Sequence, residues 1–199
     1  MRKILGLFMA LFVAMTMTGC GYNTIQQLDE EVSSNWSEVL NQYKRRADLV
    51  PQLVKVVQGY ASHEKEVFSA VSEARSKAGS INLTKEALND PKAMENFAKA
   101  QAQMTSALSR LLAVSERYPE LKANEQFRDL QSQLEGTENR ITVARNRYID
   151  AIKQYNIVIR KFPSNLTAKF FDYEVKPQFK VEDEAAVQKA PEINFDTKK

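Results

Sequence analysis

Few residues in this chain of 199 can carry out chemistry, because it contains one histidine and one cysteine. His63 precedes Glu64, and a histidine oriented by a carboxylate acts as a general acid or base when a substrate pocket adjoins it. On the helix expected here, the two side chains point about 100° apart. Zinc sites and the paired Glu-x-x-His motifs of di-iron bundles need further histidines. We therefore predict no catalytic residue, metal or cofactor, and interpret His63 as a structural or surface residue. A switch titrating near a pKa of about 6.5 is the alternative.

Cys20 ends a segment that has the order of an export signal. Arg2 and Lys3 are positive, residues 4–17 are apolar, and Met17-Thr-Gly-Cys20 follows, with small or modest residues before the thiol. This pattern resembles the bacterial lipobox, in which the cysteine is acylated through its sulfur and becomes the N-terminus after cleavage. We therefore expect Cys20 to be lipidated.

The expected division is a signal peptide over residues 1–19 and a lipidated N-terminus over residues 20–23. A helix that spans a bilayer needs about 20 apolar residues, more than this run provides, but an uncleaved anchor stays open as an alternative. A lone cysteine in an exported protein has no disulfide partner, and lipidation gives it a role. Each buried methylene contributes about 0.8 kcal/mol, so several acyl chains hold a domain durably on a membrane.

Gly21 stands where an aspartate would favour retention in the inner membrane. If the resemblance to lipoproteins of two-membrane bacteria holds, this favours the outer membrane, with the protein facing the periplasm. In a bacterium with a single membrane, the protein would face the extracytoplasmic side.

Charge gives no indication of a nucleic-acid partner. Removing Arg2 and Lys3 with the signal leaves 26 of the 28 basic residues against 25 acidic ones. This balance is nearly neutral, and no basic stripe with interleaved aromatic residues accompanies it. The remaining 180 residues are enough for one domain with a hydrophobic core.

The apolar residues recur at spacings of three and four, which predicts amphipathic helices. Four stripes run from Ile25 to Tyr43, from Val50 to Ala78, from Met94 through Phe97 to Tyr118 and from Phe127 to Phe162. Asn89-Asp90-Pro91 signals the start of the third helix, because Asn or Asp can cap it and proline is tolerated in the first turn. Since none of these helices is stable alone, we predict an all-α fold, an antiparallel helical bundle over residues 24–163.

Trp36 lies on the first stripe and is expected in the core. Tyrosines on the stripes indicate either a ligand cleft or, more commonly, buried rings with hydroxyls at the rim: Tyr43, Tyr60, Tyr148 and Tyr155.

The path of the chain at Pro51 has two interpretations. In the first, Asp48 caps a new helix after a tight turn, and Arg45 and Arg46 face the end of the preceding helix. In the second, one continuous helix is kinked at Pro51. The lack of glycine favours the kink and Asp48 favours the turn. We expect the turn, which makes four long helices.

Six residues form the candidate interaction or anion site. Its members are the charged residues before Pro51, the His-Glu pair and one further arginine: Arg45, Arg46, Asp48, His63, Glu64 and Arg75. For the first three, electrostatics at a helix end is the competing interpretation. For Arg75, the competing interpretation is an ion pair with a glutamate of another helix. Exposed pairs of this kind contribute only about 0–1 kcal/mol.

After Pro163 the composition changes. Residues 164–171 are expected to form a short helix, and residues 173–199 are expected to be largely extended because they contain Pro177 and Pro191. The segment holds too many aromatic residues for a solvated tail, so part of 164–199 should pack on the bundle: Phe170, Phe171, Tyr173, Phe179 and Phe195.

The motifs together resemble the LemA family over nearly all of the chain that follows the signal. The segments that carry the resemblance are Gly21-Tyr-Asn23, Glu31-Val32, Trp36, Tyr43-Lys-Arg-Arg-Ala-Asp-Leu-Val-Pro51, Gly59-Tyr-Ala-Ser-His-Glu64, Ala74-Arg75, Asn146-Arg-Tyr148, Tyr155-Asn156 and Phe162-Pro-Ser-Asn165. Gln52 departs from the family, which often has asparagine there, but it keeps the amide.

The resemblance implies a helical bundle attached to a membrane at its N-terminus, with no established enzymatic activity. Some relatives are linked with magnetosome formation, and others are encoded beside membrane proteins that carry a TPM-type domain. We therefore expect a non-enzymatic envelope lipoprotein that binds the membrane through Cys20 and binds another envelope or membrane protein, with TPM-type proteins as candidates. The alternative is a module that binds a lipid or a cell-wall fragment.

Overall fold

The structure is a computed structural model, which describes the backbone of residues 2–81 and 86–177 and the side chains of residues 21–81 and 88–177. These residues contain helices and no strand. The helices are α1 (Arg2–Tyr60), α2 (Lys65–Ser80), the 3₁₀ turn η1 (Glu86–Asn89), α3 (Pro91–Val114), the 3₁₀ turn η2 (Ser115–Arg117), α4 (Pro119–Ala123), α5 (Glu125–Arg160) and α6 (Ser164–Phe170). The predicted all-α bundle is confirmed.

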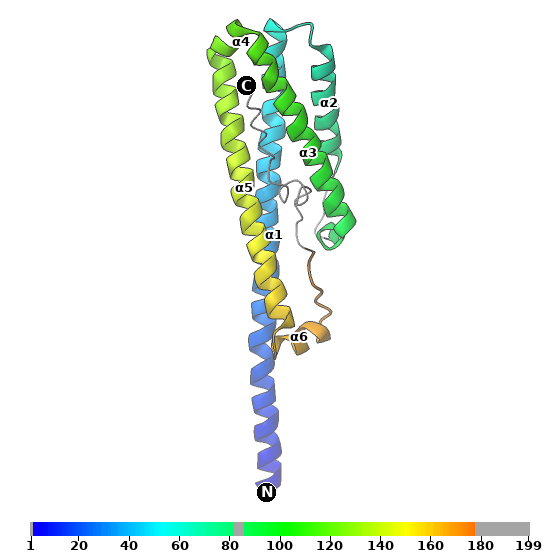
Figure 1. Ribbon diagram of the computed structural model, residues 1–199. Coiled ribbons are helices and arrows are strands. Elements are labelled where there is room, and N and C mark those ends of the chain that lie inside the picture. Colours follow the sequence, from blue (N-terminus) through cyan, green and yellow to red (C-terminus); the bar gives the residue numbers. More distant parts are fainter. Residues whose placement is uncertain (1, 82–85, 178–199) are drawn as a thin grey trace, which may run out of the picture.

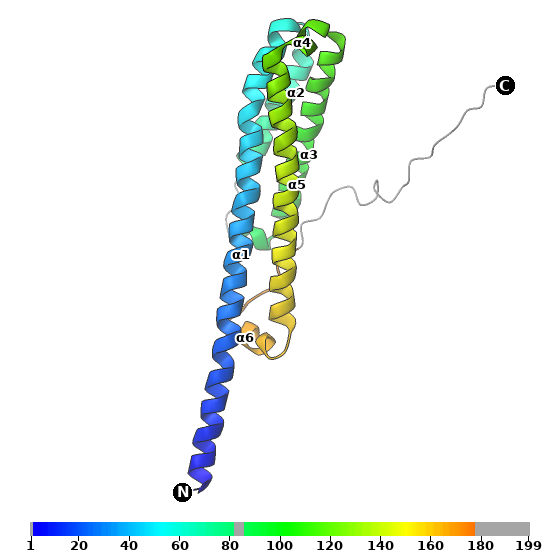
Figure 2. The same ribbon diagram turned by 90° about the vertical axis from the view of Figure 1, so that its left-hand side faces the viewer.

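The bundle is built on the antiparallel pair of α1 and α5. The two helices lie side by side over the length of α5, and the hairpin of α2 and α3 covers the upper part of the pair, to below its middle (Figures 1 and 2). The turn η2 and α4 close the upper end, and α6 lies at the lower end. Below α6, the first part of α1 extends beyond the bundle.

The predicted turn at Pro51 is wrong, because α1 continues through Pro51 as one helix. A proline has no N–H, so the carbonyl four residues earlier, that of Ala47, loses its helical hydrogen bond. Arg75 from α2 replaces the missing donor: its Nε donates to the Ala47 oxygen over 3.1 Å. Arg45, Arg46 and Asp48 consequently lie inside a helix, and the interpretation of these three as helix-end residues is also wrong.

The second predicted helix, from Val50 to Ala78, is interrupted by a turn over residues 61–64. The turn is closed by two backbone hydrogen bonds, from Ala61 N–H to the Val57 oxygen (2.9 Å) and from Glu64 N–H to the Ala61 oxygen (3.1 Å). Ala61 is buried, whereas His63 is exposed. His63 and Glu64 therefore do not share a helix, contrary to the expectation.

The start of α3 follows its sequence signal, and the start of α5 carries a side-chain cap of the same kind. The Asp90 side chain accepts a hydrogen bond from the Lys92 N–H (2.9 Å), and Pro91 occupies the first turn of α3. At the start of α5, the Asn124 side chain accepts from the Phe127 N–H over 2.8 Å. The end of α5 at Arg160 lies two residues before the predicted Phe162.

Two hydrophobic clusters fill the bundle, and a polar layer lies between them. The lower cluster contains Trp36, whose ring contacts those of Phe97 and Tyr148 with centroids 5.3 and 4.9 Å apart. The upper cluster contains Leu53 and Phe127 with residues of α2 to α4. Trp36 is 3% exposed, so its predicted core position is confirmed.

The short helix expected over residues 164–171 corresponds to α6, and the chain after it returns to the bundle. Lys176 is buried against α1 and α5. Pro191, Phe179 and Phe195 lie outside the described residues, and so does the side chain of Cys20.

Candidate functional site

Arg46 is the centre of the polar layer between the two clusters. Its side chain is 2% exposed and connects α1 with α3 and α5. Its Nη1 donates to the Thr105 hydroxyl (2.9 Å) and to a carboxylate oxygen of Glu138 (2.8 Å). Its Nη2 donates to the backbone oxygen (3.3 Å) and the side-chain oxygen (2.6 Å) of Gln101. With four such bonds inside the protein, the guanidinium fixes the register of three helices.

The aromatic neighbour of this layer is Tyr43, one turn earlier on α1. The Arg46 guanidinium carbon lies 5.0 Å from the centre of the Tyr43 ring, within range of a cation–π contact. Burial raises the pKa of Tyr43, and the positive charges of Arg145 and Arg46 act against that rise. Tyr43 therefore stays protonated at neutral pH and serves the packing of the layer.

The other predicted site residues do not converge with Arg46. Arg45 points to α5, where it donates to the Gln133 side chain over 3.1 Å, and Asp48 is exposed. Glu64 forms an ion pair with Arg117 (2.9 Å) and accepts a hydrogen bond from the Tyr118 hydroxyl (3.3 Å), and these two contacts join the turn after α1 to η2. Arg75 bonds the Ala47 carbonyl rather than a glutamate.

The tyrosines of the stripes are packing residues with one exception. Tyr43, Tyr148 and Tyr155 are at most 7% exposed, so they do not line an open cleft. Burial raises the pKa of Tyr148. Tyr60 is 41% exposed and its hydroxyl accepts from the Asn124 side chain over 3.0 Å.

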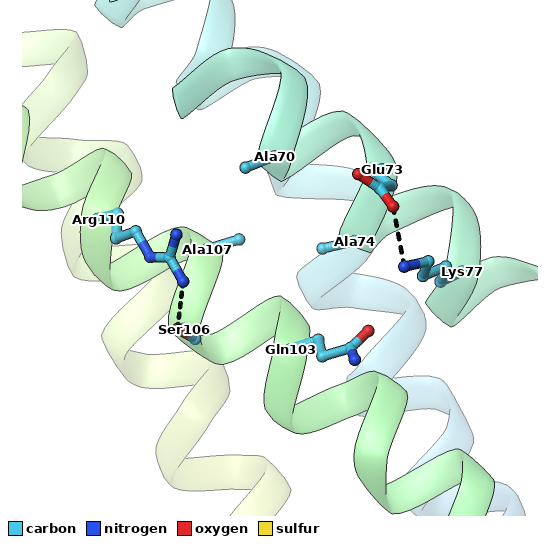
Figure 3. Close-up of a pocket in the computed structure, with 8 residues that line it drawn as sticks. All are labelled: Ala70, Glu73, Ala74, Lys77, Gln103, Ser106, Ala107 and Arg110. Carbon is cyan, nitrogen blue, oxygen red and sulfur yellow. Dashed lines mark hydrogen bonds and ion pairs between the residues drawn. The ribbon is translucent and has the colours of Figure 1, made fainter. Parts of the chain in front are cut away.

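A shallow groove separates α2 from α3 (Figure 3). Three alanines line it together with polar and charged side chains: Ala70, Ala74, Ala107, Glu73, Lys77, Gln103, Ser106 and Arg110. Glu73 and Lys77 pair across one turn at 2.8 Å, and Arg110 donates to Ser106 at 3.4 Å. The groove carries no nucleophile–base pair. Throughout the described residues, no group of three His, Cys, Asp or Glu side chains is placed to hold a metal.

A second polar cluster, not predicted from the sequence, holds the chain after α6 on the bundle. The Lys176 ammonium lies 2.9 Å from an Asp29 carboxylate oxygen and 4.9 Å from the centre of the Tyr155 ring. The Asn156 amide exchanges two 2.9 Å hydrogen bonds with the Lys176 backbone. Burial and, after it, the Asp29 charge raise the pKa of Tyr155 to about 12.

The residues directly after Cys20 in the sequence form the lower end of the bundle. A side chain on Gly21 would place its Cβ 3.3 Å from the Thr167 hydroxyl and 3.5 Å from the Ser164 hydroxyl, so α6 packs closely on α1 here. The Tyr22 and Phe171 rings are 4.8 Å apart, and the Gln26 amide donates to the Tyr173 hydroxyl. The start of α1 and the region of α6 thus form one assembled surface.

Among the residues whose side chains the structure describes, no helix has both the length and the apolar character needed to cross a membrane.

Comparison with known proteins identifies similar chains. The sequence pattern of the LemA family matches residues 35–195. Magnetosome protein MamQ 1 and MamQ 2 of Paramagnetospirillum magneticum are each 29% identical over 163 residues, which cover 74% of this chain. Magnetosome protein MamQ of Magnetospirillum gryphiswaldense is 27% identical over 158 residues, covering 71% of this chain. The matches span 58–60% of the length of these relatives.

Proposed function

This chain belongs to the LemA family, and we propose that it is a membrane-anchored lipoprotein of the bacterial envelope. In this proposal, acylated Cys20 holds the protein on the membrane. The helical bundle acts as a non-enzymatic scaffold that binds another envelope or membrane protein. It faces the periplasm, or the extracytoplasmic side of a bacterium with a single membrane.

The continuity of α1 is the observation that carries this proposal. One helix runs from Arg2 to Tyr60, so the residues after Cys20 enter the bundle without a flexible linker. At 1.5 Å per residue, residues 21–60 extend about 60 Å. This arrangement suits a scaffold, because α1 and the bundle around it form a rod that starts at the membrane. The distance of a binding surface from the membrane then follows from its position along this rod.

The use of the reactive side chains supports a role in binding rather than catalysis. The guanidinium of Arg46 is fully enclosed by the bundle, and the carboxylate of Glu64 is engaged by two residues near η2. His63 is exposed on a turn. Catalysis by a histidine needs an orienting partner and a substrate pocket beside it.

The relatives agree with this class of function. The similar proteins of Paramagnetospirillum magneticum and Magnetospirillum gryphiswaldense are named magnetosome proteins, and these names state no reaction. For this chain, the first candidates for a partner are membrane proteins with a TPM-type domain, beside which some members of the family are encoded.

The test is photo-cross-linking of the full-length protein in living cells. A photoreactive amino acid replaces Val143, which is 50% exposed on α5, in the wild-type background and with Cys20→Ser. The proposal expects one discrete cross-linked protein that purifies with the wild-type chain from membranes and disappears with Cys20→Ser.

Two results would contradict the proposal. Equal cross-linking in both backgrounds would show that the partner does not depend on the anchor. Recovery of the protein without a partner, but with lipid or glycan bound to it, would favour a module that binds a lipid or cell-wall fragment.

A further inference from the structure

The exposed apolar side chains of this protein are concentrated at one end. Eight large hydrophobic residues are exposed in the described part of the chain, and five of them lie within fourteen residues around α6. They are Phe162 (74% exposed), Leu166 (61%), Phe170 (81%), Phe171 (50%) and Val175 (51%). Single exposed apolar residues are ordinary, whereas a contiguous group marks a contact surface.

The large apolar side chains of α6 face solvent, whereas an ordinary surface helix buries its apolar face. Leu166 and Phe170 are one turn apart and exposed, and Phe162 precedes Leu166 by four residues. Ala168, between them in sequence and therefore on the other side of the helix, is 3% exposed. A small residue thus attaches α6 to the bundle, and its large apolar residues point away from it.

The position of this surface indicates what covers it. A Cβ on Gly21 would come within 3.5 Å of the Ser164 and Thr167 hydroxyls, so α6 lies against Gly21, and the Tyr22 ring contacts that of Phe171. The surface therefore begins one residue after Cys20. In Figures 1 and 2, α6 lies at the lower end of the bundle, beside the point where α1 extends beyond it. The exposed apolar residues and the proposed site of acylation are therefore at the same end of the rod.

The charge and the aromatic content fit a lipid surface. Arg160, Lys161 and Lys169 are exposed around α6, against two acidic residues, Asp172 and Glu174. Basic side chains near a bilayer attract anionic headgroups, with about 1 kcal/mol for each Lys or Arg. Tyrosine is enriched where a protein meets the headgroup region, and Tyr22 and Tyr173 belong to this surface.

We propose that α6 is a second membrane contact, lying in the headgroup region of the bilayer that carries the N-terminus. Leu166 and Phe170 enter the edge of the acyl chains, and Lys161 and Lys169 meet phosphate groups. This inference rests on the proposed membrane anchor. It adds that two adjacent contacts, the anchor and α6, set the orientation of the rod, which a single anchor would leave free to swivel.

The test uses full-length protein, purified in detergent from membranes and reconstituted into vesicles of phosphatidylethanolamine and phosphatidylglycerol, with or without brominated phosphatidylcholine. Phe170→Trp places a fluorescent reporter on α6, and Val143→Trp on α5 is the matched control, since Val143 is also exposed. The natural Trp36 is 3% exposed and gives a constant background in both variants. Flotation of the vesicles first shows whether the protein is attached.

If α6 contacts the bilayer, the Phe170→Trp emission shifts to the blue and loses intensity with brominated lipid, while Val143→Trp does not change. If the protein floats but Phe170→Trp is quenched by iodide in the aqueous phase and unaffected by brominated lipid, the inference about α6 is overturned and the anchor stands. If the protein does not float, the anchor fails, and the inference fails with it.

Discussion

The hydrogen bond from Arg75 to Ala47 should be needed only because residue 51 is proline. Without Arg75, the Ala47 carbonyl, half-buried on α1, has no donor from Pro51 and has to rely on water. A hydrogen bond to a charged group contributes about 1.5–3 kcal/mol, and exposure of Arg75 reduces this value, so we expect Arg75→Ala to cost about 1 kcal/mol. In Pro51→Ala, the new N–H at residue 51 donates to the Ala47 carbonyl. In this background, Arg75→Ala should lower the free energy of unfolding by less than about 0.5 kcal/mol.

The assay is a double-mutant cycle on the full-length protein in detergent, with urea unfolding followed by circular dichroism. Arg110→Ala is the matched control, because Arg110 is an exposed arginine that donates a hydrogen bond to Ser106 of its own helix over 3.4 Å. It should cost the same in both backgrounds. An equal cost of Arg75→Ala with proline and with alanine at position 51 would refute the explanation of how α1 tolerates Pro51.

Three further predictions concern the polar contacts of the core. Arg46→Met leaves Glu138 and Gln101 without their donor and should cost about 3 kcal/mol in urea unfolding, and Arg46→Lys should not restore it because an ammonium lacks the planar fork. Lys176→Ala should speed hydrogen exchange of residues 173–176 while leaving that of α3 unchanged; protection that persists would show that the Asp29 contact does not hold the segment. Because the pKa of Tyr155 is raised to about 12 in the folded protein, the protonated phenol stabilises the fold fully below about pH 10, and this stabilisation is lost as the pH rises through about 12. Tyr155→Phe has no such proton to lose. In thermal unfolding, its stability should therefore fall less than that of the wild type between these two pH values.

The spacing of apolar residues was enough to predict the bundle. The stripes placed Trp36, Phe97 and Tyr148 in the core, where they are at most 3% exposed. The signals at Asp90 and Pro91 placed the start of α3. These features depend on neighbours in sequence, so they are visible without knowledge of the fold.

The path at Pro51 depends on a partner from another helix. A proline inside a helix is acceptable here because a guanidinium from α2 meets the freed carbonyl, and the sequence does not show which arginine reaches it. The turn at residues 61–64 itself contains neither Gly nor Pro, and the nearest such signal is Gly59, which lies inside the last turn of α1.

The buried position of Arg46 had a signal in the sequence. Arg46 lies three residues after Tyr43 and four before Val50, which is the spacing of the apolar stripe itself. Gln101 stands in the same way between Phe97 and Met104. Polar residues at stripe positions on separate helices indicate a shared buried layer, because each needs a hydrogen-bonding partner in the core.

The intact mass of the full-length protein, extracted from cell membranes, tests the central claim most directly. The account predicts the mass of residues 20–199 plus a diacylglyceryl group and a further acyl chain. The mass should lose this addition with Cys20→Ser. A chain that still begins at Met1, with an unmodified thiol at Cys20, would contradict the lipoprotein account.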